Sequence, residues 1–150
     1  MVFMKFSTRV EYGMLALTDI ALYSERGSSV SAPDIAEREG ISQKYLEQIL
    51  TQLKQAGLIR AQKGLRGGYT LARRAEEICV ADILNALDNS ILEPQDQAEH
   101  EERSLRTAVN TCLWEKINQN LVRYAESRTL YELVHECRDR MSETWDFYSI

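Results

Sequence analysis

The chain has 150 residues, of which 44% are hydrophobic, and a formal net charge of −5. This length suffices for one globular domain with an appended helical element. The three cysteines lie far apart and form no disulfide framework. No signal-like or long apolar stretch is visible, so we expect a cytoplasmic protein with no membrane partner.

The charge is unevenly distributed along the chain. Residues 1–78 carry 11 Lys and Arg against 9 Asp and Glu, whereas residues 79–150 carry 7 against 14. The acidic total therefore does not exclude nucleic-acid binding by the first half.

A first helix is predicted from Ser7 to Tyr23, with apolar side chains repeating along one face. The start of this helix is polar and basic. Because free N–H groups at a helix N-terminus attract phosphate, it is a candidate contact to nucleic acid, and an ordinary charged cap is the alternative. The candidate residues are Lys5, Ser7, Thr8 and Arg9.

Two short helices joined by a tight turn are predicted between residues 31 and 55. Ser31 suits the N-cap of the first helix, Pro33 fits its first turn, and Gly40 ends it. Ser42 caps the second helix, whose apolar stripe consists of Leu46, Ile49, Leu50 and Leu53. This pair has the shape of a helix-turn-helix, whose second helix enters the DNA major groove.

The opposite face of the second helix is rich in amides rather than simply charged. Gln can pair with adenine, Lys with guanine, and Glu can accept a hydrogen bond from cytosine N4. A solvated polar face is the alternative, but the adjoining turn and hairpin favour DNA contact. The candidates are Ser42, Gln43, Lys44, Tyr45, Glu47 and Gln48.

A glycine-rich hairpin follows, with strand candidates at Leu58–Ala61 and Tyr69–Leu71. A helix-turn-helix followed by a hairpin is a winged helix. Residues 43–74 carry seven Lys and Arg against one acid, which is typical of a protein that reads duplex DNA. A strand and not a helix follows the paired glycines, so they do not form a nucleotide-binding loop. The wing candidates for the minor groove or its phosphates are Lys63, Arg66 and Gly67.

The second half is predicted to be helical. A short helix from Val80 to Asp88 completes a winged-helix domain of residues 1–88, and residues 89–102 form a polar linker. A helical region follows over residues 103–145, and a tail over residues 146–150.

The helical region begins with a long helix from about Arg103 to Glu126, and Thr129 caps a last helix. The apolar stripe of the long helix must be buried against its own domain or against a second copy. A protein that binds palindromic DNA needs two-fold symmetry, so we expect a homodimer. The dimerisation candidates are Leu105, Val109, Leu113, Ile117 and Leu121.

Three motifs carry a resemblance to a known family. Tyr45-Leu46-Glu47-Gln48, Gly57-Leu58-Ile59 and Gly67-Gly68-Tyr69-Thr70-Leu71 resemble the signature of the Rrf2 family of bacterial transcription regulators, and residues 4–13 resemble that family's start. The family usually has Arg where Lys63 stands, so minor-groove readout by arginine has moved to Arg66 or weakened.

The resemblance implies a mainly α (α+β) fold. This fold has an N-terminal winged helix-turn-helix, a β-hairpin wing and a long C-terminal dimerisation helix. It also implies a dimeric, sequence-specific repressor that binds double-stranded DNA at a palindromic operator. No catalytic motif is visible, so we expect no enzyme activity.

Many members of the family hold an iron–sulfur cluster on three closely spaced cysteines in the linker. Here the linker contains His100 and no cysteine. Such a cluster needs thiolates close together, so we expect no cluster, no other metal and no cofactor, as in the cluster-free Rrf2 regulators of cysteine metabolism. An iron–sulfur sensor is the less favoured alternative. We expect Cys79, Cys112 and Cys137 to be buried, unreactive thiols.

The tail contains three large apolar side chains: Phe147, Tyr148 and Ile150. Chain ends are usually polar, so this composition suggests a pocket, either on the protein's own dimer or on a partner. The second alternative rests on resemblance. Cysteine synthases accept C-terminal peptides ending in Ile, whose carboxylate takes the place of the substrate. The alternative function is therefore a protein-interaction regulator that acts mainly through a partner such as cysteine synthase.

Overall fold

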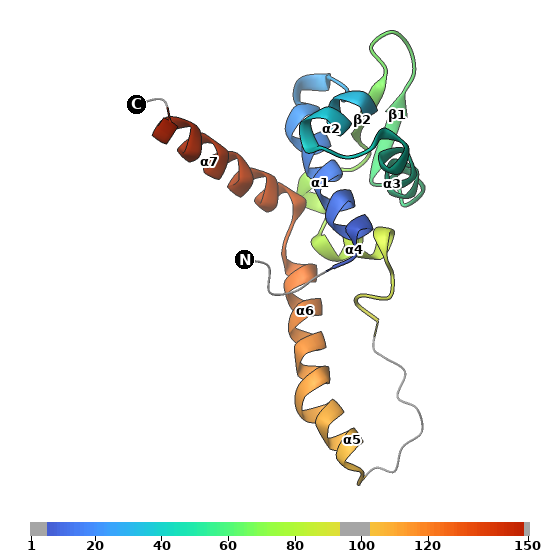
Figure 1. Ribbon diagram of the computed structural model, residues 1–150, viewed down its shortest axis with the longest axis vertical. Coiled ribbons are helices and arrows are strands. Elements are labelled where there is room, and N and C mark those ends of the chain that lie inside the picture. Colours follow the sequence, from blue (N-terminus) through green and yellow to red (C-terminus); the bar gives the residue numbers. More distant parts are fainter. Residues whose placement is uncertain (1–5, 94–102, 149–150) are drawn as a thin grey trace.

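The computed structural model describes residues 6–93 and 103–148. Three helices and a hairpin form its N-terminal part: α1 (Thr8–Tyr23), α2 (Ala32–Glu39), α3 (Gln43–Gln55), β1 (Ile59–Gln62) and β2 (Gly68–Leu71). The two strands pair antiparallel, and the hairpin projects beyond the helices (Figure 1). This arrangement is the predicted winged helix-turn-helix.

Serine side chains start these three helices, as the sequence predicts. Ser7, Ser31 and Ser42 each accept a hydrogen bond from the backbone N–H three residues later, at 3.4, 3.2 and 3.3 Å. These bonds satisfy N–H groups that the first turn of a helix leaves without a partner. Gly40 ends α2 in the left-handed conformation, with φ at 66°.

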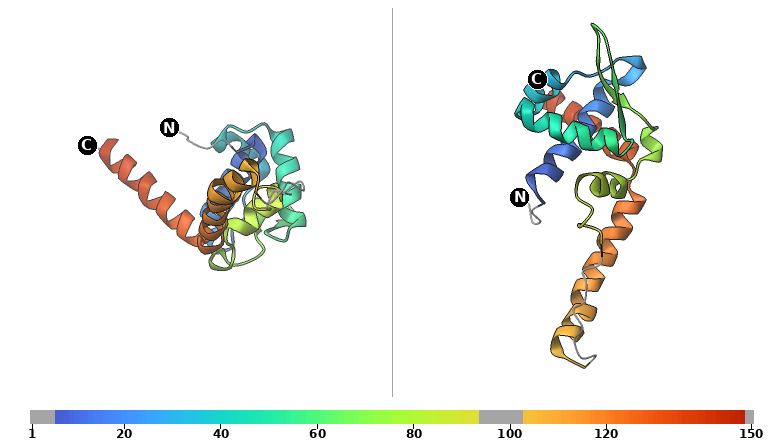
Figure 2. Two further views of the ribbon diagram at one scale, coloured as in Figure 1. Left: turned by 90° about the horizontal axis from the view of Figure 1, so that it is seen from below. Right: turned by 90° about the vertical axis from the view of Figure 1, so that its right-hand side faces the viewer.

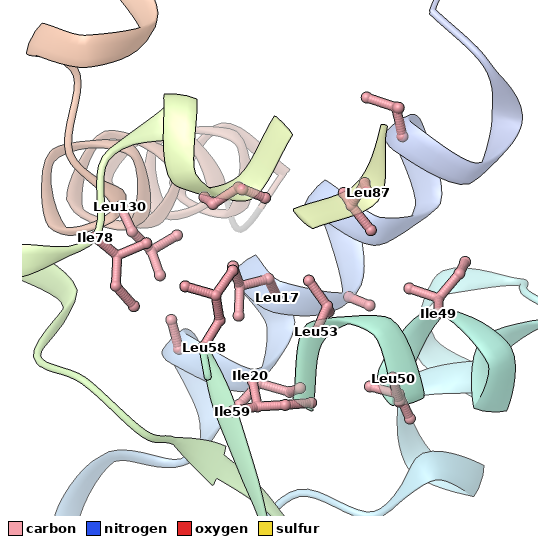
Figure 3. Close-up of a cluster of buried hydrophobic side chains, with 14 of the residues drawn as sticks. Leu17, Ile20, Ile49, Leu50, Leu53, Leu58, Ile59, Ile78, Leu87 and Leu130 are labelled. Carbon is pink, nitrogen blue, oxygen red and sulfur yellow. The ribbon is translucent and has the colours of Figure 1, made fainter. Parts of the chain in front are cut away.

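The core lies between α1, α3, β1 and α4 (Val80–Leu87). Leu17 and Ile20 of α1 meet the predicted stripe of α3, which is fully buried (Figure 3). Burying each of these side chains contributes about 1.5–3 kcal/mol, so the stripe fixes the side of α3 that faces solvent.

The C-terminal helices are attached to this core. The backbone N–H of Leu130 donates to the carbonyl oxygen of Ile78 at 2.8 Å, and the N–H of Val80 donates to that of Arg128 at 2.8 Å. Leu130 is fully buried beside Ile78 (Figure 3). The chain therefore returns to the first domain between its last two helices.

A long helix extends away from the core (Figure 1). It consists of α5 (Leu105–Val109), the π-helical segment η3 (Asn110–Trp114) and α6 (Glu115–Ser127). The sequence predicts this helix to within two residues at its start and one at its end, but not its π-helical segment. Among the described residues, no helix is long and apolar enough to span a bilayer.

The last helix, α7 (Leu130–Tyr148), is longer than predicted. Thr129 caps it, accepting from the N–H of Glu132 at 3.1 Å. Its C-terminal part leaves the body of the molecule (Figures 1 and 2). The prediction of a separate tail from residue 146 is wrong as far as residue 148, because Phe147 and Tyr148 continue the helix. Ile150 lies outside the described residues.

The cysteines differ in exposure. Cys112 is exposed, whereas Cys79 and Cys137 are partly buried. The prediction of three buried thiols is therefore wrong for Cys112. The reason is that this thiol lies in η3, a part of the long helix that no other described element covers. His135 is exposed and stacks on Tyr131 with ring centroids 5.9 Å apart. His100 lies outside the described residues.

Candidate nucleic-acid interface

The solvent-facing side of α3 carries most of the predicted recognition residues. Gln43, Lys44, Glu47 and Gln48 are exposed there, opposite the buried stripe. Ser42 precedes them as the N-cap. No other element of the described residues covers this face, and amide and charged groups on an open helix face suit the edges of bases in a major groove.

Tyr45 differs from these neighbours because it is half-buried. Its ring packs edge-on against Tyr12 of α1, with centroids 5.9 Å apart and the planes at 73°. Tyr45 thus helps to set the distance between α1 and α3.

An open cleft of about 630 Å³ joins α3 to the start of α1. Three predicted phosphate contacts, Ser7, Thr8 and Arg9, line it, and Lys5 lies outside the described residues. The other lining residues are Tyr45 and Gln52 of α3 and Asn85, Ala86, Leu87, Asp88 and Asn89. The structure therefore brings one predicted residue of α3, Tyr45, together with three predicted residues that lie 36 or more positions away in sequence.

Asn85, Asp88 and Asn89 were not predicted, because only the fold brings the end of α4 to this cleft. The hydroxyl and backbone N–H of Ser90 hold the pKa of Asp88 below its usual range, and the positive charge of Arg9 adds a smaller contribution. Asp88 is therefore a carboxylate at neutral pH, and it reduces the positive potential near Arg9.

The wing is attached to the loop before α2. Val30 and Tyr69 exchange two backbone hydrogen bonds, of 2.9 and 2.7 Å. A Cβ atom on Gly68 would lie 2.5 Å from the carbonyl oxygen of Val30, so this close approach requires glycine. Nearer the tip, the hydroxyl of Ser29 donates to the carbonyl oxygen of Arg66 at 2.6 Å.

The basic residues in and near the wing differ in whether their side chains bond to the protein itself. Arg60 donates to the carbonyl oxygen of Ala72 at 3.1 Å, and Arg73 donates to that of Glu77 at 2.6 Å. By contrast, Lys63 and Arg66 are exposed and form no ion pair with an acid of the described chain. The positive charges of Lys63 and Arg66 are therefore free to bind phosphate.

An ion pair with a buried carboxylate connects α2 to α1. Arg38 donates to both carboxylate oxygens of Asp19, at 3.0 and 2.9 Å, and its guanidinium lies 4.2 Å from the ring centre of Tyr23. The side chain of Asp19 is fully buried. No sequence motif marks this pair, because its members lie 19 positions apart and on different helices.

Known proteins share both the sequence and the fold. Residues 6–136 match the Rrf2 family, described as iron-dependent transcriptional regulators. A helix-turn-helix transcriptional regulator of Synechocystis sp. PCC 6803 is 37% identical over 135 residues, which cover 90% of each chain.

Two solved structures are similar over most of their length. CymR, the global cysteine regulator of B. subtilis, superimposes with a TM-score of 0.74 at 28% identity, over 89% of this chain and 98% of that one. IscR of T. potens gives a TM-score of 0.72 at 32% identity, over 90% and 89%. These relatives are transcriptional regulators and not enzymes. This chain belongs to the Rrf2 family of helix-turn-helix transcriptional regulators.

Proposed function

We propose that the chain is a dimeric repressor that binds a palindromic operator, with α3 in the major groove and the wing at the minor groove. The observation that carries this proposal is the uncovered polar face of α3 beside a wing whose Lys63 and Arg66 have no acidic partner in the described chain. The start of α1 contributes phosphate contacts through Ser7, Thr8 and Arg9. Its free N–H groups supply the attraction, and Arg9 offsets the charge of Asp88.

Dimerisation is supported by apolar side chains on the long helix. Leu105 is 80% exposed, Val109 41%, and Leu113 and Ile117 45% each. The stripe repeats every four residues, which overshoots a full α-helical turn by about 40° at each step. The wider turn of η3 offsets part of this drift, so the side chains stay nearer one face. A second copy is the occupant that an operator with two-fold symmetry requires.

The donor atoms do not fit the iron centre that the family's description implies. The cysteines lie at the start of α4, in η3 and in α7. Within the two described ranges, no three His, Cys, Asp or Glu side chains are grouped so that they could hold a metal ion. The nine residues between these ranges contain no cysteine. Because an iron–sulfur cluster needs neighbouring thiolates, we propose a regulator without a cluster.

Binding of selected DNA tests the groove assignment. Duplexes are selected from a random-sequence pool with the unmodified protein, and affinities are measured at about 50 and about 200 mM salt. Arg66→Ala should weaken binding to every sequence and reduce the salt slope by about one unit. Gln43→Ala should instead lower the preference for the selected site by roughly 1–3 kcal/mol. If neither variant changes binding, the groove assignment is wrong.

A second role is favoured by the C-terminal sequence and by the similarity to a cysteine regulator. We propose that residues 146–150 bind cysteine synthase, with Ile150 in the substrate site. A peptide of residues 144–150 should release heat when titrated into the cysteine synthase of the same organism and should compete with substrate. The absence of heat at high micromolar peptide, or binding that survives deletion of Ile150, would contradict this role.

A further inference from the structure

The tip of the wing is a tight turn with an apolar side chain at its outermost point. The N–H of Gly67 donates to the carbonyl oxygen of Gly64 at 2.9 Å, so Leu65 and Arg66 occupy the two central positions. The relative exposure of Leu65 is 109%, the highest of the large hydrophobic side chains in the described residues. The hairpin carries this turn away from the helices (Figure 1).

A single exposed leucine is common on protein surfaces and needs no explanation by itself. The position of Leu65 suggests a function, because the cationic residues Lys63 and Arg66 flank it on the same loop. The loop is also held in shape. A Cβ atom on Gly67 would lie 2.6 Å from the carbonyl oxygen of Gln62, and Ser29 anchors Arg66 as described above. Binding therefore costs little additional ordering of the backbone.

We propose that Leu65 is an apolar wedge that enters the DNA minor groove beside Arg66 and partly unstacks one base step. Apolar side chains that enter this groove act in this way in many architectural proteins, and leucine is among them. The negative potential of a narrow minor groove attracts Arg66, which brings Leu65 to the floor of the groove. The inference rests on the proposed DNA-binding function and adds a contact that uses no hydrogen bond.

The wedge also predicts a sequence preference. Pyrimidine–purine steps unstack at the lowest energetic cost, so a wedge favours operators that carry such a step under the wing. A two-fold dimer has two wings, which places two equivalent steps on either side of the operator centre. Specificity at these steps arises from deformation of the DNA rather than from recognition of base edges.

Affinity measurements separate the wedge from the charge beside it. The probe is the duplex selected by the unmodified full-length protein. Leu65→Ala should weaken binding roughly tenfold without changing the salt slope, since only apolar contact is lost. Leu65→Gln has a side chain of similar size that is polar, and its affinity for the duplex should fall nearly as much as that of Leu65→Ala. Leu65→Met keeps an apolar side chain and should bind within about threefold of the unmodified protein.

Fluorescence of 2-aminopurine, placed in turn at each adenine of the duplex, reports unstacking directly. Binding of the unmodified protein should brighten two positions related by the operator's two-fold axis, and Leu65→Ala should abolish the increase. The wedge is wrong if Leu65→Ala binds within about twofold of the unmodified protein with the same fluorescence, while Arg66→Ala still weakens binding. If no duplex is selected at all, the DNA-binding proposal itself fails and the wedge fails with it.

Discussion

Asp19 is a charged side chain in the core, with 1% of its surface exposed. Such burial is tolerated only with a well-placed partner, and the planar guanidinium of Arg38 supplies two parallel hydrogen bonds. The pair joins α1 to α2, and α2 in turn packs on α3. The ion pair therefore supports the recognition helix indirectly, through α2, in addition to the direct packing of α3 on α1.

Loss of Arg38 should destabilise the fold, because it leaves a buried carboxylate without its cation. We expect Arg38→Met to lower the free energy of unfolding by on the order of 3 kcal/mol. Arg138→Met is the matched control, since Arg138 pairs with Glu25 at the surface and its loss should cost less than about 1 kcal/mol. Urea unfolding of both variants measures the difference, and equal losses would contradict the role of Arg38.

Glu39 lies next to this pair and gives the fold a pH dependence. Burial, together with a hydrogen bond to Asp19 and its negative charge, raises the pKa of Glu39 to about 7, against the opposing charge of Arg38. A raised pKa means that the folded state favours the protonated form. The stabilisation is therefore complete below the usual pKa of 4.5 and is lost as the pH rises to about 7.

Glu39→Gln should remove this dependence. Between pH 5 and pH 8 the unmodified protein should lose stability relative to the variant, by less than about 1 kcal/mol because Glu39 is partly exposed. Glu37→Gln on the exposed side of α2 is the control. Unfolding curves at both pH values test the prediction, and a variant with the same pH profile as the unmodified protein would refute it.

At the scale of single elements, the long helix is the element whose exposed apolar side chains most clearly predict a binding partner. Its apolar side chains remain exposed in one chain. We expect Leu113→Asp combined with Ile117→Asp to give monomers or unfolded chain, because charges would lie in the interface. Leu65→Asp, which puts one such charge on the wing, should stay dimeric. Sedimentation of the unmodified protein should give about twice the chain mass, and a stable monomer would exclude the dimer.

The helix-turn-helix could be predicted from sequence because its signals are local. Ser31, Gly40 and Ser42 mark the helix ends, and the stripe from Leu46 to Leu53 marks the buried side of α3. The end of α7 carries no such signal, and the sequence therefore predicts a tail where the structure has helix. The exposure of Cys112 depends on what covers a helix, and no periodicity in one chain contains that information.

Some residues of the candidate interface could also be predicted from local sequence signals, and others could not. The residues of α3 and the wing follow from one continuous stretch of sequence. The cleft at Arg9 and Asn85 and the ion pair of Asp19 with Arg38 required the fold, because their members come from different helices. Leu65 lies in the predicted turn, but its importance comes from its full exposure between two cations.

At the scale of the whole molecule, the wing and the free end of the long helix lie at opposite ends (Figure 1). Pairing through the long helix would therefore leave both wings accessible to DNA. The charge follows the same division, with a net +2 in residues 1–78 and −7 in residues 79–150. The acidic half lowers nonspecific attraction to DNA, so binding depends more on the local contacts of α3 and the wing.

The absence of a cysteine group leads to a prediction about iron. Protein purified without oxygen should be colourless and should lack stoichiometric iron and sulfide, because no cysteine triad can hold a cluster. Iron and sulfide analysis tests this prediction. A brown preparation with near-stoichiometric iron and sulfide would contradict the prediction.

A footprint of the full-length protein on the selected duplex tests the central claim most directly. Hydroxyl-radical protection and methylation interference together report which grooves the protein covers. We predict a two-fold pattern, with major-groove contacts in two half-sites separated by about 10 base pairs or a multiple, and protected minor grooves beside them. One-sided protection, or protection that nonspecific competitor DNA removes, would contradict a dimer that reads DNA with α3 and the wing.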